Sequence, residues 1–167
     1  IVRNHLALIE YGERDPLTGL LNRKTFEHQF EKLRCTTLEA VTEQRAEHFI
    51  GLVDVDRFKG INDRFGHVFG DEVLLLVSQI IQRTFRGVDH VYRFGGEEFV
   101  ILLRDATLDG AAGAMERLRA AVEKHPFPQL GTVTISLGWT RIRAHDSPTH
   151  AIERADAALY HAKHTGR

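Results

Sequence analysis

The sequence predicts an α+β fold in which helices flank a mostly antiparallel sheet. From residue 49 onward, segments with strand-like alternation and helix-like spacing follow one another in the order βαββαβ, and one more helix comes after them. The two middle strands are separated by Gly95 and Gly96, a pair that predicts a tight hairpin and therefore antiparallel strands. This order is typical of ferredoxin-like and palm-like folds, which support many functions.

Composition narrows the class of protein. The chain has 167 residues, 43% hydrophobic and 27% charged, so it can form one domain with a full core and does not resemble a disordered chain. Its 22 Lys and Arg against 23 Asp and Glu give a net charge of -1, which argues against binding nucleic acid or an anionic membrane through overall charge. No apolar run approaches the ~20 residues of a membrane helix. We therefore expect no nucleic-acid partner and no membrane contact by this domain.

The ends and the cysteine content indicate a cytoplasmic piece of a longer protein. Cys35 is the single cysteine, which excludes a disulfide within the chain and fits a reducing compartment. The chain begins with Ile1, and apolar residues at positions 2, 6 and 9 form one helical stripe. This stripe is either a short terminal helix or the end of a signalling helix from an upstream domain. We divide the chain into residues 1–12, the end of a linker helix, and residues 13–167, one domain; a preceding part of the protein remains free to anchor it in a membrane.

The first half of the domain contains a turn, a helix and a strand. Residues 15–19 predict a turn, and Asn22 is suited to cap a helix whose buried face holds Phe26, Phe30 and Leu33. Residues 36–46 are polar and favour no element. Residues 49–56 predict a buried strand that ends in carboxylates, and a loop rich in Gly, Asn and Asp follows over residues 58–67.

The second half alternates helices and strands. Helices are expected over residues 71–85 and 111–122, and strands over residues 90–94, 99–103 and 133–139. Ser147 followed by Pro148 predicts the start of a final helix, because serine caps a helix and proline fits its first position.

Two acidic clusters are the first candidates for chemistry. Asp54 and Asp56 lie two apart on the predicted strand and so share a face, and the hairpin turn is followed by Glu97 and Glu98. We expect the first strand and the first hairpin strand to be neighbours, so that Asp54 and Glu97 together bind one or two Mg²⁺ ions. The alternative is a solvated strand end beside an ordinary acidic hairpin.

Basic and polar residues near these acids suit a nucleotide. Lys59 is placed to neutralise phosphate charge, and Asn62 and Asp71 are suited to hydrogen-bond guanine. Asp71 has a competing explanation, since an acid in the first turn of a helix interacts favourably with its dipole. Lys163 and Arg167 lie four apart on one face of the last helix, and a basic helix end is the alternative there.

Several motifs in order resemble the GGDEF domains of diguanylate cyclases. Gly95-Gly96-Glu97-Glu98-Phe99 is similar to the motif that names the family, in its Glu-containing form. The other similar segments are Asp15-Pro16-Leu17-Thr18-Gly19-Leu20-Leu21-Asn22-Arg23, Asp54-Val55-Asp56-Arg57-Phe58-Lys59, Ile61-Asn62-Asp63, Phe65-Gly66-His67, Gly70-Asp71, Ser136-Leu137-Gly138 and residues 155–167. The resemblance covers about residue 13 to the end. One departure is the stretch over residues 35–47, which is longer than the usual loop of the family.

The resemblance implies an enzyme that joins two GTP molecules into cyclic di-GMP and releases two diphosphates. It implies Mg²⁺, or Mn²⁺ in its place, bound by Asp54, the Val55 carbonyl and Glu97. It assigns catalytic roles to Glu97, which also assists deprotonation of the attacking hydroxyl, to Lys59, and to Glu98, whose own role is less defined. The implied GTP-binding residues are Phe58, Asn62, His67, Asp71, Gly95, Gly96, Lys163 and Arg167.

The resemblance also implies regulation and assembly. Arg86 and Asp89 match an Arg-x-x-Asp product-inhibition motif placed five residues before Gly95, and Arg117 matches a second arginine of that site. A helix-end arginine and a turn aspartate are the alternative. The implied partners are GTP, cyclic di-GMP as product and inhibitor, and a second copy of the chain for catalysis. Two other functions remain open: a non-catalytic module that binds GTP or cyclic di-GMP, and another palm-fold cyclase or polymerase.

Overall fold

The computed structural model describes residues 12–39 and 47–165 of the chain. In these ranges the strands are β1 (Leu21–Asn22), β2 (Glu47–Val55), β3 (His90–Gly95), β4 (Glu98–Ala106) and β5 (Ile135–Arg141). The helices are α2 (Arg23–Glu39), α3 (Phe58–Phe65), α4 (His67–Thr84), α5 (Leu108–Lys124) and α6 (Pro148–Thr165). The predicted boundary at residue 12 and the predicted linker helix before it rest on residues 1–11, which lie outside the described ranges.

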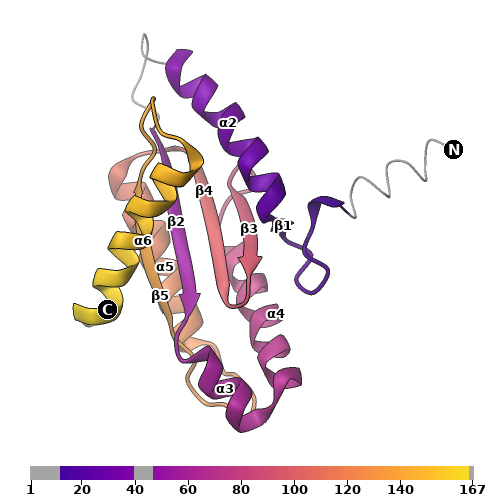
Figure 1. Ribbon diagram of the computed structural model, residues 1–167. Helices are drawn as coiled ribbons and strands as arrows, with labels where there is room; N and C mark the ends of the chain where they lie inside the picture. The colour runs from indigo at the N-terminus through magenta and orange to yellow at the C-terminus, as the bar shows by residue number, and fades with distance from the viewer. Residues whose placement is uncertain (1–11, 40–46, 166–167) are drawn as a thin grey trace, which may run out of the picture.

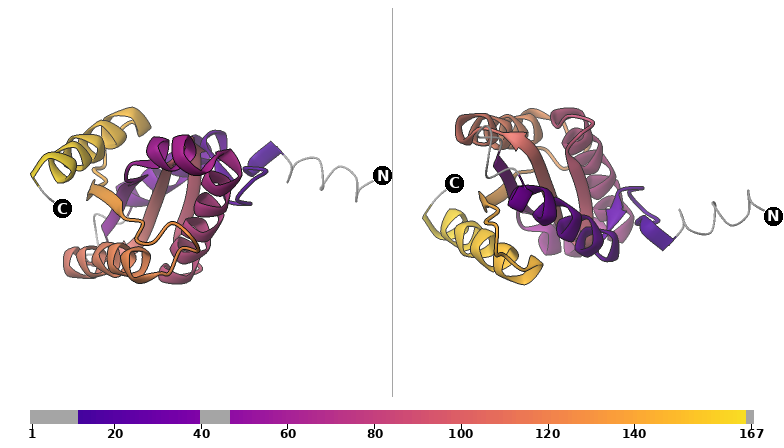
Figure 2. Two further views of the ribbon diagram at one scale, coloured as in Figure 1. Left: turned by 90° about the horizontal axis from the view of Figure 1, so that it is seen from below. Right: turned by 90° about the horizontal axis from the view of Figure 1, so that it is seen from above.

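One five-stranded sheet organises the fold, with the strand order β1-β3-β4-β2-β5. The pairs β3–β4, β4–β2 and β2–β5 are antiparallel, and the short β1 pairs in parallel with β3. Helices α2 and α6 cover one face of the sheet, and α4 and α5 cover the other, as Figures 1 and 2 show. The prediction of an α+β fold with a mostly antiparallel sheet is confirmed.

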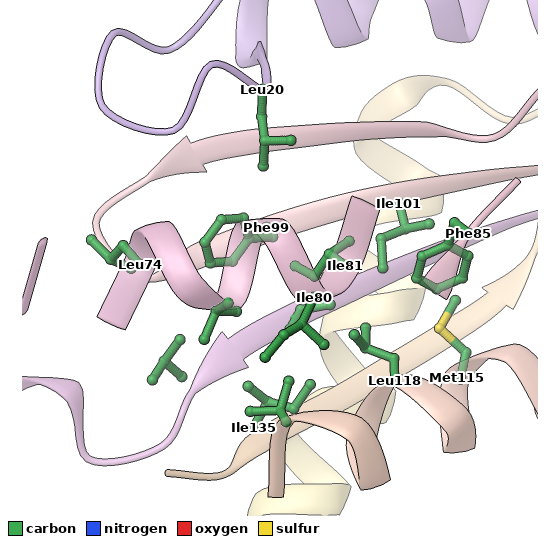
Figure 3. Close-up of a cluster of buried hydrophobic side chains, with 14 of the residues drawn as sticks. Leu20, Leu74, Ile80, Ile81, Phe85, Phe99, Ile101, Met115, Leu118 and Ile135 are labelled. Carbon is green, nitrogen blue, oxygen red and sulfur yellow. The ribbon is translucent and has the colours of Figure 1, made fainter. Parts of the chain in front are cut away.

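Apolar side chains fill both sides of the sheet. The larger cluster joins the α4–α5 face of the sheet to those two helices, and Figure 3 shows Ile81, Phe99, Ile101 and Leu118 meeting there. The smaller cluster lies under α2 and α6, where Phe26 and Phe30 of α2 pack at the same face as Tyr92 and Val100 of the sheet. Alternate residues of β3 and β4 therefore point to opposite faces, as the period of two along a strand requires.

The predicted neighbour of β2 is wrong by one strand. We expected β2 to pair with the first hairpin strand, but it pairs with the second, β4, and β3 lies one position further out. Both edges of β3 are already paired, one with β1 and the other with β4. The remaining edge of β4 is therefore the one that pairs with β2. The turn between β3 and β4 still lies at the end of β2, because Asp54 is the register partner of Glu98.

The segment expected as a loop over residues 58–67 is instead helix α3, followed at once by α4. Phe58 is buried and Ile61, three residues later, packs against the same core, which gives this polar stretch an apolar side. Arg57, the N-cap residue that precedes α3, has the left-handed conformation, with φ 57°. Helix α4 begins at His67, so Asp71 lies in its second turn, and the prediction of a first-turn acid is wrong.

The two predicted helix caps, Asn22 and Ser147, and the hairpin turn are confirmed, whereas α4 and α5 begin four and three residues before the predicted starts at residues 71 and 111. Asn22 Oδ1 accepts a hydrogen bond from the Thr25 N–H at 3.0 Å, and Ser147 Oγ accepts one from the His150 N–H at 3.1 Å. Gly95 and Gly96 both have positive φ, 134° and 53°, a region that disfavours residues with a Cβ.

Candidate active site

The two acidic clusters meet where β2 ends and the β3–β4 turn begins. Asp54 and Glu98 are directly opposite each other on β2 and β4, so their side chains share one face of the sheet. The next residues are also joined, because the Val55 N–H donates to the Glu97 carbonyl at 3.3 Å. In Figure 1 this turn, the end of β2 and the start of α3 lie together at the lower end of the sheet.

Negative charge is concentrated around Glu98. Burial raises the pKa of the Glu98 carboxyl, and the nearby carboxylates of Asp54, Glu97 and Asp156 raise it further, while Lys163 opposes them. Asp156 of α6 was not among the predicted site residues. The sequence feature that could have indicated Asp156 is its position seven residues before Lys163, because residues at this spacing lie on one face of a helix.

Lys163 contacts the acidic cluster directly. Its Nζ lies 2.9 Å from Asp54 Oδ1, and the Asp54 side chain is only 13% exposed. We predicted Lys163 as a ligand of the triphosphate tail, whereas here its ammonium group neutralises the carboxylate at the end of β2. Its partner in that prediction, Arg167, lies outside the described residues, so both tail contacts stay predictions.

Asp56, the second acid of the Asp-x-Asp pair, has a different environment. Its carboxylate accepts hydrogen bonds from the hydroxyls of Thr134 and Ser136, both at 2.6 Å, and its N–H donates to the Thr134 carbonyl. These bonds attach the end of β2 to β5 and to the residue that precedes it. Asp56 therefore positions the acidic end of β2.

Arg93 holds the glycine turn. Its guanidinium donates to the Gly96 carbonyl at 2.9 Å and pairs with the Asp15 carboxylate at 3.0 Å. Asp15 in turn accepts from the N–H and hydroxyl of Thr18, and these bonds together hold its pKa below the ordinary value even though burial opposes them. The segment of residues 15–23 is thus connected to the turn that precedes Glu97. Arg93 was not among the predicted site residues.

Helices α3 and α4 bring the predicted guanine ligands together. Asn62 Oδ1 is buried and has no hydrogen-bond partner among the described residues. It lies over Gly70, where an added Cβ would be 1.9 Å from it. Asp71 follows Gly70 and is exposed on α4. An orphaned acceptor beside an exposed carboxylate fits a ligand edge with several N–H groups, as guanine has.

The other predicted nucleotide contacts are spread around these two helices. Lys59 and His67 are exposed, at the start of α3 and of α4, whereas the Phe58 ring is buried in the core. Gly95 and Gly96 are exposed at the turn and have no atom within 4 Å of an added Cβ, so the backbone there is open to approach by a ligand.

The acids fit a hard divalent cation, although they do not enclose one. No three His, Cys, Asp or Glu side chains of residues 12–39 and 47–165 converge as a metal cluster. The predicted ligand set needs only the Asp54 and Glu97 carboxylates and the Val55 carbonyl, with phosphate oxygens of the substrate completing the shell. The repulsion that raises the pKa of Glu98 is the observation that favours a cation at this place.

A second group of predicted residues lies away from these acids. Arg86, Asp89 and Arg117 line one cavity of about 380 Å³ beside the end of α4. The Asp89 side chain is 2% exposed and accepts from the Arg86 guanidinium and from the main-chain N–H groups of Arg86 and Arg104. The two arginines are thus the exposed members of this trio, and Asp89 orients Arg86.

The described helices include none that is both long enough and apolar enough to cross a bilayer.

Comparison with known proteins finds curated diguanylate cyclases that are similar to this chain. It is 39% identical to the diguanylate cyclase DgcP of Pseudomonas aeruginosa over 158 residues, which cover 92% of this chain and 23% of DgcP. It is 40% identical to the diguanylate cyclase DgcM of Escherichia coli over 156 residues, 93% of this chain and 37% of DgcM. The chain therefore spans well under half the length of these curated relatives.

Solved structures share the same architecture. The coiled coil and GGDEF domain of DgcB from Caulobacter crescentus, solved in complex with c-di-GMP, matches with a TM-score of 0.89 at 29% identity, covering 99% of this chain and 88% of the chain in that structure. The family model for the diguanylate cyclase GGDEF domain matches residues 13–167. With the acidic hairpin, the guanine-suited pair and the whole fold in agreement, the chain belongs to the GGDEF domain family of diguanylate cyclases.

Proposed function

We propose that this domain is a diguanylate cyclase that condenses two GTP molecules into cyclic di-GMP. The observation that supports this most directly is the register pairing of Asp54 with Glu98, which brings both acidic motifs to one edge next to α3 and α4. In each half of the reaction a 3′-hydroxyl attacks the α-phosphate of the other GTP, a new P–O bond forms, and the bond to diphosphate breaks. Family membership and the names of the curated relatives also support this activity.

The chain's own residues bind, orient and neutralise. Asn62 and Asp71 hold guanine, Gly95 and Gly96 let the backbone approach the phosphates, and Lys59 stabilises charge that develops on them. Glu97 accepts the proton of the attacking hydroxyl, and Glu98 adds to the negative field at the turn. Phosphoryl transfer depends mainly on such positioning and charge stabilisation.

Asp54, Glu97 and the Val55 carbonyl would hold Mg²⁺, or Mn²⁺ in its place. When bound there, the cation supplies Lewis-acid polarisation of the phosphoryl oxygens. Lys163 must then leave Asp54, which its position on the solvent side of α6 allows, since its side chain is 38% exposed. Lys163 and Arg167 are then free to meet the triphosphate tail.

The reaction requires two copies of the chain. The product is two-fold symmetric with two identical bonds, while one chain has one set of acids and one Asn62–Asp71 pair. Two domains facing each other in an isologous arrangement present each hydroxyl to the partner's phosphate. We expect residues 1–12 to be the end of a linker helix that brings the copies together, and the start of the family match at residue 13 supports that boundary. Specific activity should therefore rise with protein concentration, and a coiled coil fused before Ile1 should raise it further.

The test is incubation of the purified chain with GTP and Mg²⁺ at high protein concentration, followed by identification of products by mass. Cyclic di-GMP and diphosphate are expected from the wild type and not from Glu97→Gln, which keeps the shape of the side chain and removes its charge. Glu153→Gln, a matched change at an exposed site on α6, should retain the wild-type rate.

Two results would contradict the proposal. If GTP binds by calorimetry and is recovered unchanged at every protein concentration, also with the coiled coil fused, the domain is a binding module. If Glu97→Gln makes the product at the wild-type rate, the acidic hairpin is not the catalytic centre.

A further inference from the structure

Basic side chains gather at the end of the sheet opposite the acids, on the face covered by α2. His90 of β3 and Arg104 of β4 lie on neighbouring strands, and both share that face with the residues that pack under α2. Burial lowers the pKa of His48 of β2, Asp105 opposes this, and Arg104 lies close enough to lower it further. Three groups that can be cationic therefore lie side by side across three adjacent strands.

The Arg104 guanidinium lacks a partner among the described residues. Its Nε is buried, and its side chain makes no hydrogen bond or ion pair with any described residue. The main chain of the same residue is fully used, since its N–H donates to Asp89 and its carbonyl accepts from Arg86. Tyr92, whose hydroxyl is also buried and unpaired, lies within the electrostatic reach of Arg104. Such groups cost stability unless an acceptor reaches them.

A cavity opens next to these groups. It has a volume of about 160 Å³ between α2 and strands β3 and β4. Its polar lining is Lys32 and Gln29 from α2 with His90 and Arg104 from the sheet. No carboxylate from the described residues lines it. The buried Asp89 carboxylate already accepts from Arg86 and the Arg104 N–H.

We propose that this cavity binds a phosphate-class oxyanion between Lys32, His90 and Arg104. Guanidinium, ammonium and imidazolium groups are the side chains that bind such oxygens with charge-assisted hydrogen bonds. The volume is far below the roughly 300–1,000 Å³ of pockets for drug-sized ligands, so a single phosphate group fits and a whole nucleotide does not. The site is separate from the acidic hairpin and from the cavity of Arg86 and Arg117.

Binding should strengthen as the pH falls. Burial lowers the pKa of His90, and Arg104 lowers it further, while Asp89 has the opposite effect. The other groups that face His90 are Tyr92, whose ring meets it edge-on, Lys32 across the cavity, and Arg14 and Arg86, which line a neighbouring cavity together with His90. An anion in the cavity offsets the positive charge of Arg104 and so raises the pKa of His90. By linkage, protonation of His90 strengthens binding of the anion.

The test is a titration of the wild-type protein with inorganic phosphate at constant ionic strength, followed by NMR of the His90 imidazole. Chloride at the same ionic strength controls for screening, EDTA removes metal, and His90→Gln assigns the signal. We expect phosphate to raise the pKa of His90 and chloride not to. Glycerol 3-phosphate in a parallel titration distinguishes a phosphomonoester ligand from the free ion.

Variants separate this cavity from other anion sites. Arg104→Gln should weaken phosphate binding at His90 by about tenfold or more, the effect of losing one charge-assisted bond. Lys32→Gln, at an exposed position that cannot disturb the core, should weaken it several-fold, and Lys24→Gln, eight residues earlier on α2, should not. If phosphate leaves the His90 signal unchanged in the wild type, or Lys32→Gln and Arg104→Gln bind as the wild type does, the proposal is wrong.

Discussion

Lys163 Nζ lies 2.9 Å from Asp54 Oδ1, so a cation of the protein itself occupies the edge of the carboxylate that is predicted to bind metal. The ammonium group comes from α6, while Asp54 is on β2, and no other described basic residue is paired with Asp54. A divalent ion bound by Asp54 would therefore compete with Lys163 for one carboxylate, and its binding would depend on the position of α6.

Replacement of Lys163 tests this competition. Lys163→Met should lower the free energy of unfolding without metal by at most about 1 kcal/mol, because the lysine is partly exposed and solvent screens the pair. Added Mg²⁺ should then stabilise the variant more than the wild type, since no ammonium has to be displaced. Melting curves in EDTA and in Mg²⁺ measure both effects, with Lys124→Met, exposed at the end of α5, as the control. Equal gains from Mg²⁺ in all three proteins would show that the ion pair is incidental.

Gly70 should be essential for guanine binding without touching the ligand. In Gly70→Ala the new methyl group would lie 1.9 Å from Asn62 Oδ1, so the amide has to move. GTP affinity measured by calorimetry should fall by about tenfold, the equivalent of one lost hydrogen bond of roughly 1.4 kcal/mol.

Gly60→Ala is the matched control in α3, because nothing lies within 4 Å of its added Cβ. It should keep the affinity for GTP and gain up to about 1 kcal/mol of stability from helix propensity. The same loss of affinity in both variants would mean that α3 is disturbed generally and that the packing of Asn62 on Gly70 is unimportant.

The charge of Glu98 should reduce stability at neutral pH. Its pKa is raised in the folded protein, so the folded state binds this proton more tightly than the unfolded state does. The stabilisation that comes from protonated Glu98 is fully present below the pKa of the unfolded state, and it is lost as the pH rises through the pKa of the folded state. Glu98→Gln should therefore melt higher than the wild type at pH 7, and the difference should shrink as the pH falls toward 4.5, the ordinary value for Glu. A difference that is constant from pH 7 to pH 4 would exclude this explanation; Glu153→Gln serves as the reference.

Replacement of Asp54 should mainly affect Mg²⁺ binding, whereas replacement of Asp56 should mainly affect stability. Asp56→Ala removes the acceptor of two 2.6 Å bonds from Thr134 and Ser136 and should cost roughly 1.5–3 kcal/mol of unfolding free energy, while the stabilisation by Mg²⁺ remains. Asp54→Ala relieves repulsion with Glu98 but loses the partly exposed ion pair with Lys163, so stability should change little, while the stabilisation by Mg²⁺ is lost. Denaturant unfolding with and without Mg²⁺ measures both. Loss of the Mg²⁺ response in Asp56→Ala would assign Asp56 to the metal site instead.

Arg86 should contribute to product binding. Arg86→Ala removes a guanidinium suited to two acceptors on guanine, worth about 1–3 kcal/mol, or roughly a 5- to 150-fold weaker affinity for cyclic di-GMP. Calorimetry with cyclic di-GMP and full progress curves are the measurements, and the variant's curve should bend later than that of the wild type. Arg83→Ala, exposed in the last turn of α4, is the control. If Arg86→Ala binds the product as the wild type does, its contacts with Asp89 and the Arg104 carbonyl are its whole role.

Local patterns predicted most elements of the fold. Asn22, Ser147 and the Gly95–Gly96 pair have effects that depend on neighbouring backbone alone, and each does what was expected of it. Helix α3 was missed because its Gly, Asn and Asp content favours a loop, and its stability depends on Phe58 and Ile61 meeting a core formed by distant segments.

The candidate site likewise contains residues that the sequence predicts and pairings that it does not. The acids, Lys59, Asn62 and Asp71 are identifiable because their residue types and spacing indicate metal and guanine ligands. The pairings of Lys163 with Asp54, Arg93 with Asp15, and Asp56 with Thr134 each join residues at least 78 positions apart. No pattern within a short window predicts which distant residue will be the partner.

The sequence by itself determined the α+β class, the hairpin, the helix caps and the residue types of the site, because these depend on periodicity, backbone preference and chemistry of nearby residues. Tertiary structure alone decided that β2 pairs with β4, that Asn62 lies over Gly70, and that Arg104 has no side-chain partner within residues 12–39 and 47–165 although it lies beside His90 and Lys32. The physical reason is that strand order and side-chain neighbours are set by the burial of the whole apolar surface at once, in which each choice depends on every other.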